Sequence, residues 1–466
     1  MTTTASSTPL ASSAPLERDA RLVNAREHKV APGDIAIGVI IGRTSEFFDF
    51  FVYAIASVLV FPAIVFPYVD RLTGTLYSFA VFALAFMARP LGTLIFIAID
   101  RRHGRGVKLT IAMFLLGGST MAMALLPSYE QVGALAVWLL AAFRIGQGIA
   151  LGGAWDGLPS LLSLNAPPNR RGWYAMIPQL GAPLGLLLAI GLFAYFLAIL
   201  SQADFLSWGW RYPFFVVLAI NVVALFARLR LVATPEFQHL FESQELQPSP
   251  PFETLAAEIR TITLGAFAPL ASFALFHLVT VFPLSWVTLY AGEQPLRFLL
   301  IEAVGAVVCV LAMLASGVIA DRVGRRPVLG ISALLIGAYS GFAPRLLDAG
   351  GVGETVYMIV GFALLGLAFG QSSGAVNKSF PPHHRYTGAA IVANSAWLLG
   401  GGFAPLVALF LASELGLWSV GLYLLSGCIA TIAALMINRD WGNIEAVLPP
   451  RAEGSADERT ASPVRA

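Results

Sequence analysis

Apolar runs of about 20 residues recur along the whole chain, and they limit what it can fold into. A run of this length can cross the hydrocarbon core of a bilayer as a helix. Only 12% of the 466 residues are charged, whereas soluble domains carry about 25%. The sequence therefore predicts an all-α membrane protein with many spans.

The number of spans follows from hydropathy and from the placement of Lys and Arg, which concentrate in cytoplasmic loops. We expect twelve spans, at 35–58, 73–98, 108–126, 132–163, 172–199, 210–228, 260–289, 296–319, 328–344, 354–377, 386–411 and 416–437. With both chain ends in the cytoplasm, few Lys or Arg residues lie elsewhere: Arg71, Arg211, Arg297 and Arg345 in outer loops, and Arg43, Arg89 and Arg144 within spans.

The two halves of the chain repeat short motifs in the same order. DRRHGR at 100–105 corresponds to DRVGRR at 321–326, and APPNRRGWY at 166–174 to PPHHRYTGA at 381–389. Facing six-helix repeats around a central cavity are a known transporter architecture. We expect a polar tail (1–33), two six-helix halves (34–228 and 260–437), a cytoplasmic linker (229–259) and a second polar tail (438–466).

Composition and missing motifs argue against several other functions. The net charge is only +2, so nucleic acid is not an expected partner. Cys309 and Cys428 lie in apolar segments, which suggests small buried side chains rather than a disulfide or a metal site. The sequence lacks the common ATP-binding, metalloprotease and hydrolase motifs, so we expect neither an enzyme nor a cofactor. We also expect no removable signal peptide at the start.

The stretch IGRTSEFFDFFVY, at 41–53, places three charges inside the first span. Arg43, Glu46, Asp49 and Tyr53 share one helix face. A charge at mid-bilayer costs about 2.5–3.5 kcal/mol, so such residues usually face a cavity or a partner. Arg43 can neutralise one acid, and the other, left without a partner, is suited to bind and release a proton. The alternative is a static role, in which Glu46 is clamped by Arg43 or Asp49 fixes a helix contact.

The fourth span places Arg144 and Gln147 one turn apart. Arginine can hold a carboxylate through two parallel hydrogen bonds, which suggests recognition of an anionic metabolite. The alternative is a strut from Arg144 to Glu46 or Asp49. Asp156, farther along, is either a third proton-coupling residue or a cap of a turn.

Other polar or amphipathic side chains within the spans are candidates for substrate contact. These side chains are Gln179, His277, Trp286, Gln371, Asn394 and Trp397. Together with Arg43, Tyr53, Arg144 and Gln147 they make up the expected substrate site. Each has a structural alternative. A lone buried histidine is more often hydrogen-bonded in a core, Glu302 near the start of its span can lie at the membrane interface, and Trp286 can belong to an aromatic belt.

Several motifs, in order and each in the expected span, resemble one family. EFFDFFVY (46–53), ARPLG (88–92), RIGQGIALGGAWDG (144–157), FLSWGWRYPF (205–214), ATPEF (233–237), GVIADRVGRRPVL (317–329) and RYTGA (385–389) resemble motifs of the major facilitator superfamily, in its metabolite:proton symporter branch. The resemblance implies proton-coupled uptake of a small organic acid or related polar metabolite by alternating access of the halves.

The resemblance also implies two gating loops at the cytoplasmic ends of the helices. Their residues are Asp100, Arg101, Arg105, Asp321, Arg322, Gly324 and Arg325. We expect Asp321 to pair with Arg322 and Arg325 in a latch that stabilises the outward-open state, or these charges simply to anchor the loop inside. The chain departs from the family pattern at Arg101, where an acid is usual, at Ala154, which replaces a glutamate, and at Lys378.

The sequence is also compatible with two other functions. The same fold could drive efflux of a drug or metabolite, and a non-transporting membrane sensor is a further alternative. The expected partners are a small-molecule substrate, protons and the lipid bilayer. We expect a monomer in the cell membrane, which is the inner membrane if the source is bacterial.

Overall fold

The computed structural model describes residues 32–154, 169–232, 246–292, 294–372 and 379–438, together with 157, 162, 166 and 167. Every regular element within these residues is a helix. Lys378 lies outside the described residues, and so does Asp156. The expected roles of both therefore stay predictions.

The first half of the chain forms six long helical segments with short helices between them. The long segments are α2 (Pro32–Leu59), α4 (Arg71–His103), α5 (Arg105–Ala124), α7 (Leu135–Gly153), a fifth made of α9 (Arg171–Met176), η1 (Ile177–Leu180) and α10 (Gly181–Ile199), and α12 (Arg211–Val232). The short helices are α3 (Phe61–Ile64), α6 (Tyr129–Val132), α11 (Gln202–Asp204) and η2 (Phe205–Gly209).

The second half repeats this arrangement. Its first long segment is divided into α15 (Ile259–Phe267), α16 (Leu270–Thr280), α17 (Phe282–Trp286) and η3 (Val287–Ala291). Then follow α18 (Pro295–Val323), α19 (Arg325–Asp348), α20 (Gly351–Phe369), the segment of α21 (Pro382–Ala396), η5 (Trp397–Gly402) and α22 (Ala404–Leu415), and α23 (Trp418–Ile437). The short helix α14 (Pro251–Ala257) lies within the expected linker.

The helices account for all twelve expected spans. Among the described residues, eleven helical segments are long and apolar enough to cross a membrane. The twelfth is α2, with 28 residues, which differs from the others in carrying Arg43, Glu46 and Asp49. The predicted all-α fold with twelve membrane helices is therefore confirmed. In the fourth span α7 ends at Gly153, and most of the remaining residues of the predicted span, 154–163, lie outside the described residues.

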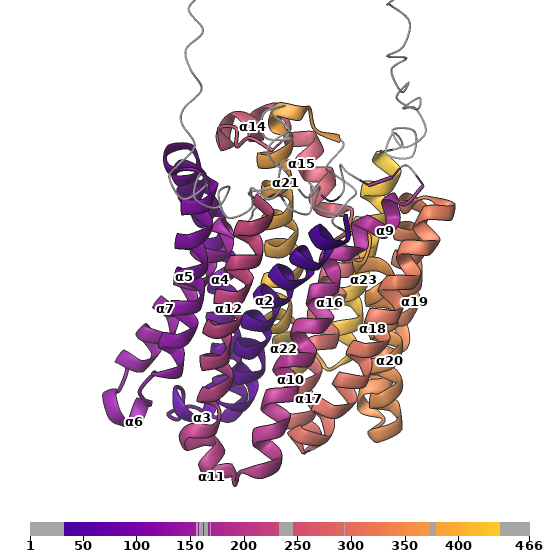
Figure 1. Ribbon diagram of the computed structural model, residues 1–466. Coiled ribbons are helices and arrows are strands. Elements are labelled where there is room, and N and C mark those ends of the chain that lie inside the picture. The colour runs from indigo at the N-terminus through magenta and orange to yellow at the C-terminus, as the bar shows by residue number, and fades with distance from the viewer. Residues whose placement is uncertain are drawn as a thin grey trace, which may run out of the picture.

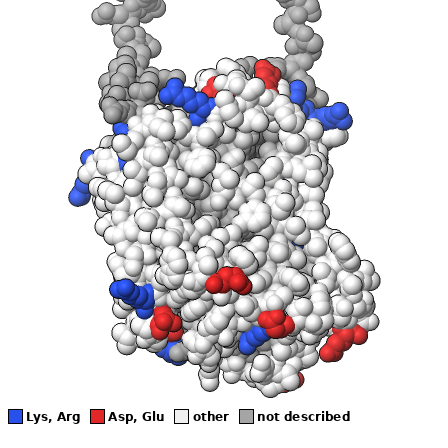
Figure 2. All heavy atoms as spheres, turned by 180° about the vertical axis from the view of Figure 1, so that it is seen from behind, with Lys and Arg blue, Asp and Glu red and all other residues white. Residues whose placement is uncertain are grey.

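The long helices run side by side along one direction (Figure 1). At the upper end of the figure lie α9, α14 and α15, and at the lower end lie α3, α6 and α11. Figure 2 shows that Lys, Arg, Asp and Glu gather toward the two ends of the face it presents. A charge-poor middle is what the hydrocarbon core of a bilayer requires.

Small residues bring α4 and α7 into close contact. A Cβ on Gly92 would overlap the backbone of Ile149, and a Cβ on Gly148 would overlap the backbone of Ala85. Glycine at such positions lets two helix backbones approach each other. This contact fixes the position of Arg144, one turn before Gly148 on α7.

One-residue connections join two of the helix pairs. Gly104 alone separates α4 from α5, with φ of 84°, and Gly324 alone separates α18 from α19, with φ of 88°. Positive φ values at such turns favour glycine, because a Cβ would be strained there. The turn expected at Gly324 is present, and Gly104 shows that the repeat extends to backbone conformation.

Candidate functional site

Glu46 on α2 is held by two arginines. Its carboxylate accepts hydrogen bonds from Arg43 and from Arg228 of α12, each at 2.5 Å. Arg228 also donates to the carbonyl of Ala154, 2.8 Å away at the end of α7. The ion pair of Arg43 with Glu46 was expected. The contact of Arg228 was not, because in the sequence Arg228 is one of several cationic residues at the end of an apolar span.

The direct hydrogen-bond partners of Asp49 are neutral side chains. Its Oδ1 accepts hydrogen bonds from Thr120 of α5 and Gln147 of α7, both at 2.7 Å. Among the described residues, Asp49 forms no salt bridge and its Oδ2 has no hydrogen-bond partner. Within the α2 stripe, Glu46 thus pairs with Arg43, whereas Asp49 bonds to side chains of α5 and α7.

Arg144 approaches Asp49 only through Gln147. Its Nη1 donates to Gln147 Oε1 at 2.9 Å, and its Nε donates to the carbonyl of Phe82 at 3.2 Å. Its guanidinium carbon lies 4.1 Å from the centre of the Tyr53 ring. A direct strut from Arg144 to Glu46 or Asp49, one of the expected alternatives, is not formed in the described part of the chain.

Several buried polar atoms around Arg144 have no hydrogen-bond partner within the described residues. They are Arg144 Nη2, the Tyr53 hydroxyl and both ring nitrogens of His277. Tyr53 and His277 are fully buried. Among the described residues, His277 is therefore not the hydrogen-bonded core histidine of the first alternative. Native proteins rarely leave buried polar groups without partners, so such a group requires an explanation.

Aromatic rings from both halves fill the centre of the molecule. The Trp397 ring of η5 lies 5.9 Å from Phe47 of α2 and 5.2 Å from Phe276 of α16, and the His277 ring lies 5.2 Å from Phe50 of α2. The expected central cavity is thus closed by packed rings in this structure. A narrow apolar pocket beside them lies between the halves and is lined by Phe51, Ala182, Pro183, Leu186, Phe276, Thr280, Cys309, Met313, Phe362 and Leu365.

Two further predicted site residues connect the halves by hydrogen bonds. Asn394 of α21 donates to Thr93 of α4 at 2.7 Å, and Gln179 of η1 donates to Ser372 at 3.0 Å. Both therefore lie in the interface where alternating access would require movement.

Trp286 and Gln371 make their described contacts away from Arg144. The Trp286 ring stacks on Tyr290, 4.3 Å away. The Gln371 amide donates to the carbonyl of Gly172 at 3.2 Å, and its Oε1 accepts from Arg325 at 3.4 Å. Gln371 thus belongs to the contact at the upper end of the molecule rather than to the central cluster.

That contact is organised by Asp321 of α18. Its carboxylate accepts from the backbone N–H groups of Gly172 and Trp173, at 2.6 and 3.3 Å, in the first turn of α9. The expected pairing of Asp321 with Arg322 and Arg325 is wrong for the described residues. Arg322 is exposed, and Arg325 donates to the carbonyl of Arg171 at 3.3 Å. A carboxylate is well placed at a helix start, because the N–H groups there lack partners.

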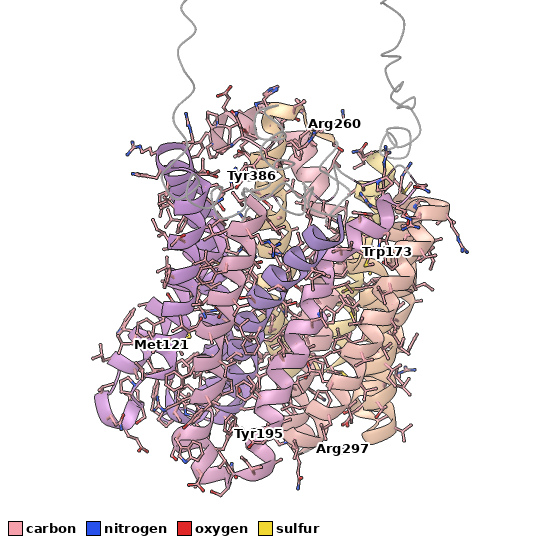
Figure 3. The ribbon with its side chains drawn as sticks, in the orientation of Figure 1. Met121, Trp173, Tyr195, Arg260, Arg297 and Tyr386 are labelled. Atoms are coloured by element: carbon pink, nitrogen blue, oxygen red, sulfur yellow. The ribbon has the colours of Figure 1, made fainter. Side chains whose placement is uncertain are left out.

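The corresponding loop of the first half contacts α21. Asp100 is buried between Arg105 and Lys108, at 3.2 and 3.5 Å, whereas Arg101 is exposed. The Lys108 amine donates to the Tyr386 hydroxyl at 2.7 Å. Figure 3 places Tyr386 and Trp173 toward the upper end and Arg297 at the lower end. Lys108 and Tyr386 were missed, since nothing in the sequence pairs residues 278 positions apart.

Comparison with known proteins identifies the family. Residues 45–397 match the family model described as Major Facilitator Superfamily. The chain belongs to the Major Facilitator Superfamily. The chain is 36% identical to the inner membrane metabolite transport protein YhjE of Escherichia coli K12, covering 87% of this chain and 94% of that protein. It is 32% identical to the shikimate transporter of the same strain, covering 87% and 94%.

Solved structures agree with this assignment at the level of the fold. The crystal structure of the D-xylose-proton symporter has a TM-score of 0.66 and 18% sequence identity, covering 87% of this chain and 97% of that one. This Major Facilitator Superfamily chain is therefore a multi-pass membrane transporter rather than an enzyme.

Proposed function

We propose that this transporter imports a small organic anion together with protons, by alternating access of its two halves. The observation that carries the proposal is the buried charge pair of Asp49 and Arg144. Neither forms a salt bridge with a described residue, and Gln147 bonds to both. Buried charges in proteins are normally paired directly, so this separation calls for a function.

Charge balance explains how the two sites would be coupled. Without substrate, an ionised Asp49 offsets the positive charge of Arg144 through Gln147. When a substrate carboxylate binds to Arg144, an ionised Asp49 would leave one excess negative charge in a water-poor site. Such a charge is costly, so substrate binding requires a proton on Asp49. Release of both to the cytoplasm restores the first state.

The surroundings of Arg144 support an organic anion with an apolar or cyclic body. Arg144 and His277 carry polar atoms without a partner among the described residues, and these atoms can bind the polar part of such a molecule. The rings of Phe50, Phe82 and Trp397 are suited to its flat or apolar part. The similarity to a shikimate transporter is compatible with this class of substrate.

The cellular arrangement is also a proposal. The upper end of Figure 1 would face the cytoplasm, because Lys and Arg are enriched in the loops assigned to that side. Both chain ends would lie there, in an inner membrane if the source is bacterial. A monomer would be sufficient, since each chain contributes both halves of the transport path.

The proposal is tested by uptake into proteoliposomes of radiolabelled shikimate, benzoate, succinate, citrate and proline. We expect shikimate or benzoate to accumulate only when the outside is more acidic than the inside. Asp49→Asn should lower accumulation at least tenfold for each unit of pH difference yet retain exchange across preloaded vesicles, because a permanently neutral side chain permits binding but carries no proton.

Glu46→Gln is the control, since the carboxylate of Glu46 forms ion pairs with two arginines in the wild type. This variant should keep its dependence on the proton gradient. Full accumulation by Asp49→Asn would contradict the proposed proton site, and proton-driven loss of solute from preloaded vesicles would show efflux instead.

A further inference from the structure

Glu302 on α18 is a buried acid that the proposed mechanism does not use. Its side chain is 0% exposed, and neither carboxylate oxygen has a hydrogen-bond partner in the described part of the chain. The expectation that it lies at the membrane interface is therefore wrong. A buried carboxyl group without partners is strongly unfavourable as an anion, so it carries its proton when the halves are packed as in this structure.

The position of Glu302 on its helix directs it toward the interface between the halves. Residues 302, 309 and 313 lie on one face of α18, because positions seven and eleven apart are close to two and three full turns. Cys309 and Met313 line the narrow pocket between the halves. Glu302 stands on the same face, two turns closer to the end where Arg297 lies (Figure 3).

The titratable side chains of α19 and α20 near this part of α18 are bonded to other groups. On α20, Glu354 pairs with Arg297 at 3.7 Å, and the Tyr357 hydroxyl donates to the carbonyl of Leu278. On α19, the Tyr339 hydroxyl donates to the carbonyl of Tyr357 at 2.9 Å.

The other elements packed against α18 offer no cation at this level. The only titratable side chain of α10 is Tyr195, which is exposed, and α17 has none. The remaining charges of α19 lie near its two ends, at Arg325, Arg326, Arg345 and Asp348, and Arg171 and Tyr174 of α9 lie at the opposite end of α18. No described group therefore holds Glu302 as an anion.

We infer that Glu302 is a second proton-binding site of the transport cycle, located in the second half of the chain. The carboxylate takes a proton from water when the interface opens on the outer side. It carries the proton through the closed arrangement and releases it to water when the interface opens on the cytoplasmic side. This inference rests on the proposed proton-coupled uptake, and it predicts two protons for each substrate anion, one at Asp49 and one at Glu302.

The number of protons is measured from the accumulation ratio in proteoliposomes with the membrane potential clamped at zero, using shikimate as the probe. Each coupled proton multiplies accumulation by about ten for each unit of pH difference. The wild type should therefore reach about 100-fold per unit and Glu302→Gln about tenfold. Glutamine resembles the protonated acid in shape, so this variant should fold. An unchanged accumulation ratio in Glu302→Gln would overturn the inference.

Glu354→Gln is the matched control, because it removes another buried glutamate of the same half while leaving the expected stoichiometry unchanged. Loss of all accumulation in Asp49→Asn with an unchanged ratio in Glu302→Gln would retain the proposed function and reject the second site.

Infrared difference spectra provide a readout that needs no substrate. Between about pH 5 and 9, where buried carboxyl groups of proteins titrate, the wild type in vesicles should show a protonated-carboxyl band that responds to pH and is missing in Glu302→Gln. A band that is lost in this variant but does not respond to pH in the wild type would show a static buried acid and overturn the inference.

Discussion

The two acids of α2 lie one turn apart and yet have different chemical surroundings. Glu46 contacts two guanidinium groups, whereas Asp49 contacts a hydroxyl and an amide. An acid fixed by two cations gains little by binding a proton, and an acid held by neutral groups can change its charge at lower cost. This contrast favours Asp49 over Glu46 as the residue that exchanges protons.

Replacing Arg144 by lysine tests its proposed role in anion binding. Lysine keeps the charge but cannot donate two parallel hydrogen bonds while also bonding to Gln147 and the carbonyl of Phe82. Loss of one charge-assisted hydrogen bond, about 1.5–3 kcal/mol, should weaken binding of a transported acid roughly 10- to 100-fold. Calorimetric titration of the purified variant measures this change, and unaltered affinity would refute the role.

The sequence predicted which residues carry charge in the membrane but only part of their pairing. Arg43 and Glu46 are three positions apart on one helix, so their contact follows from helix geometry. Arg228 and Thr120 come from other helices, and their contacts depend on how the helices pack. Thr120 did give a signal, as a polar residue within an otherwise apolar span.

At the scale of helices, the spans were predictable, whereas the interruptions of the seventh and eleventh spans were not. Hydropathy and the positions of Lys and Arg placed all twelve segments. The divisions of the seventh span at Pro269 and Val281 and of the eleventh at Trp397 were not predicted. The division at Pro269 follows from proline, which lacks an N–H donor. The π-helical turns of η5 depend on how the neighbouring helices pack against it.

Gly148→Ala tests the close packing of α4 on α7. The new Cβ would overlap the Ala85 backbone, and overpacking of this kind costs about 1–3 kcal/mol. We expect a lower midpoint of thermal unfolding in detergent, followed by intrinsic tryptophan fluorescence.

Gly191→Ala on α10 is the matched control, since nothing lies within 4 Å of the new Cβ. Alanine favours a helix over glycine by up to about 1 kcal/mol, so this variant should be equally or more stable. Equal destabilisation by both changes would show that the α4–α7 contact is not the cause.

At the scale of the whole molecule, two contacts related by the internal repeat join the halves at one end. Asp321 binds the start of α9, and Lys108 binds Tyr386 near the start of α21. The repeated motifs predicted that both loops would have equivalent positions. The sequence could not predict that backbone N–H groups, rather than arginine side chains, are the partners of Asp321.

Asp321→Ala should shift the molecule toward opening at this end, because Gly172 and Trp173 lose the acceptor for their N–H groups. A cysteine introduced at Met176, which is buried against the other half, reports the opening. Its labelling by a membrane-impermeant thiol reagent in inverted vesicles should accelerate about tenfold for each 1.4 kcal/mol of stabilisation lost.

The labelling experiment uses a background in which Cys309 and Cys428 are replaced by alanine. Asp321→Asn keeps one acceptor oxygen and should give a smaller acceleration. If labelling is equally slow in the wild type and in Asp321→Ala, this contact does not hold the end closed.

The one-residue connections at Gly104 and Gly324 have a mechanical consequence. A single residue spans at most about 3.6 Å, so neither α4 and α5 nor α18 and α19 can slide apart at the end where they join. Each hairpin must therefore tilt as a rigid unit. The contacts that separate are those of the α4–α5 hairpin with α21 and of the α18–α19 hairpin with α9. The path that admits water would therefore form along these two contacts. A crosslink across either contact should prevent the tilt while leaving the hairpin intact.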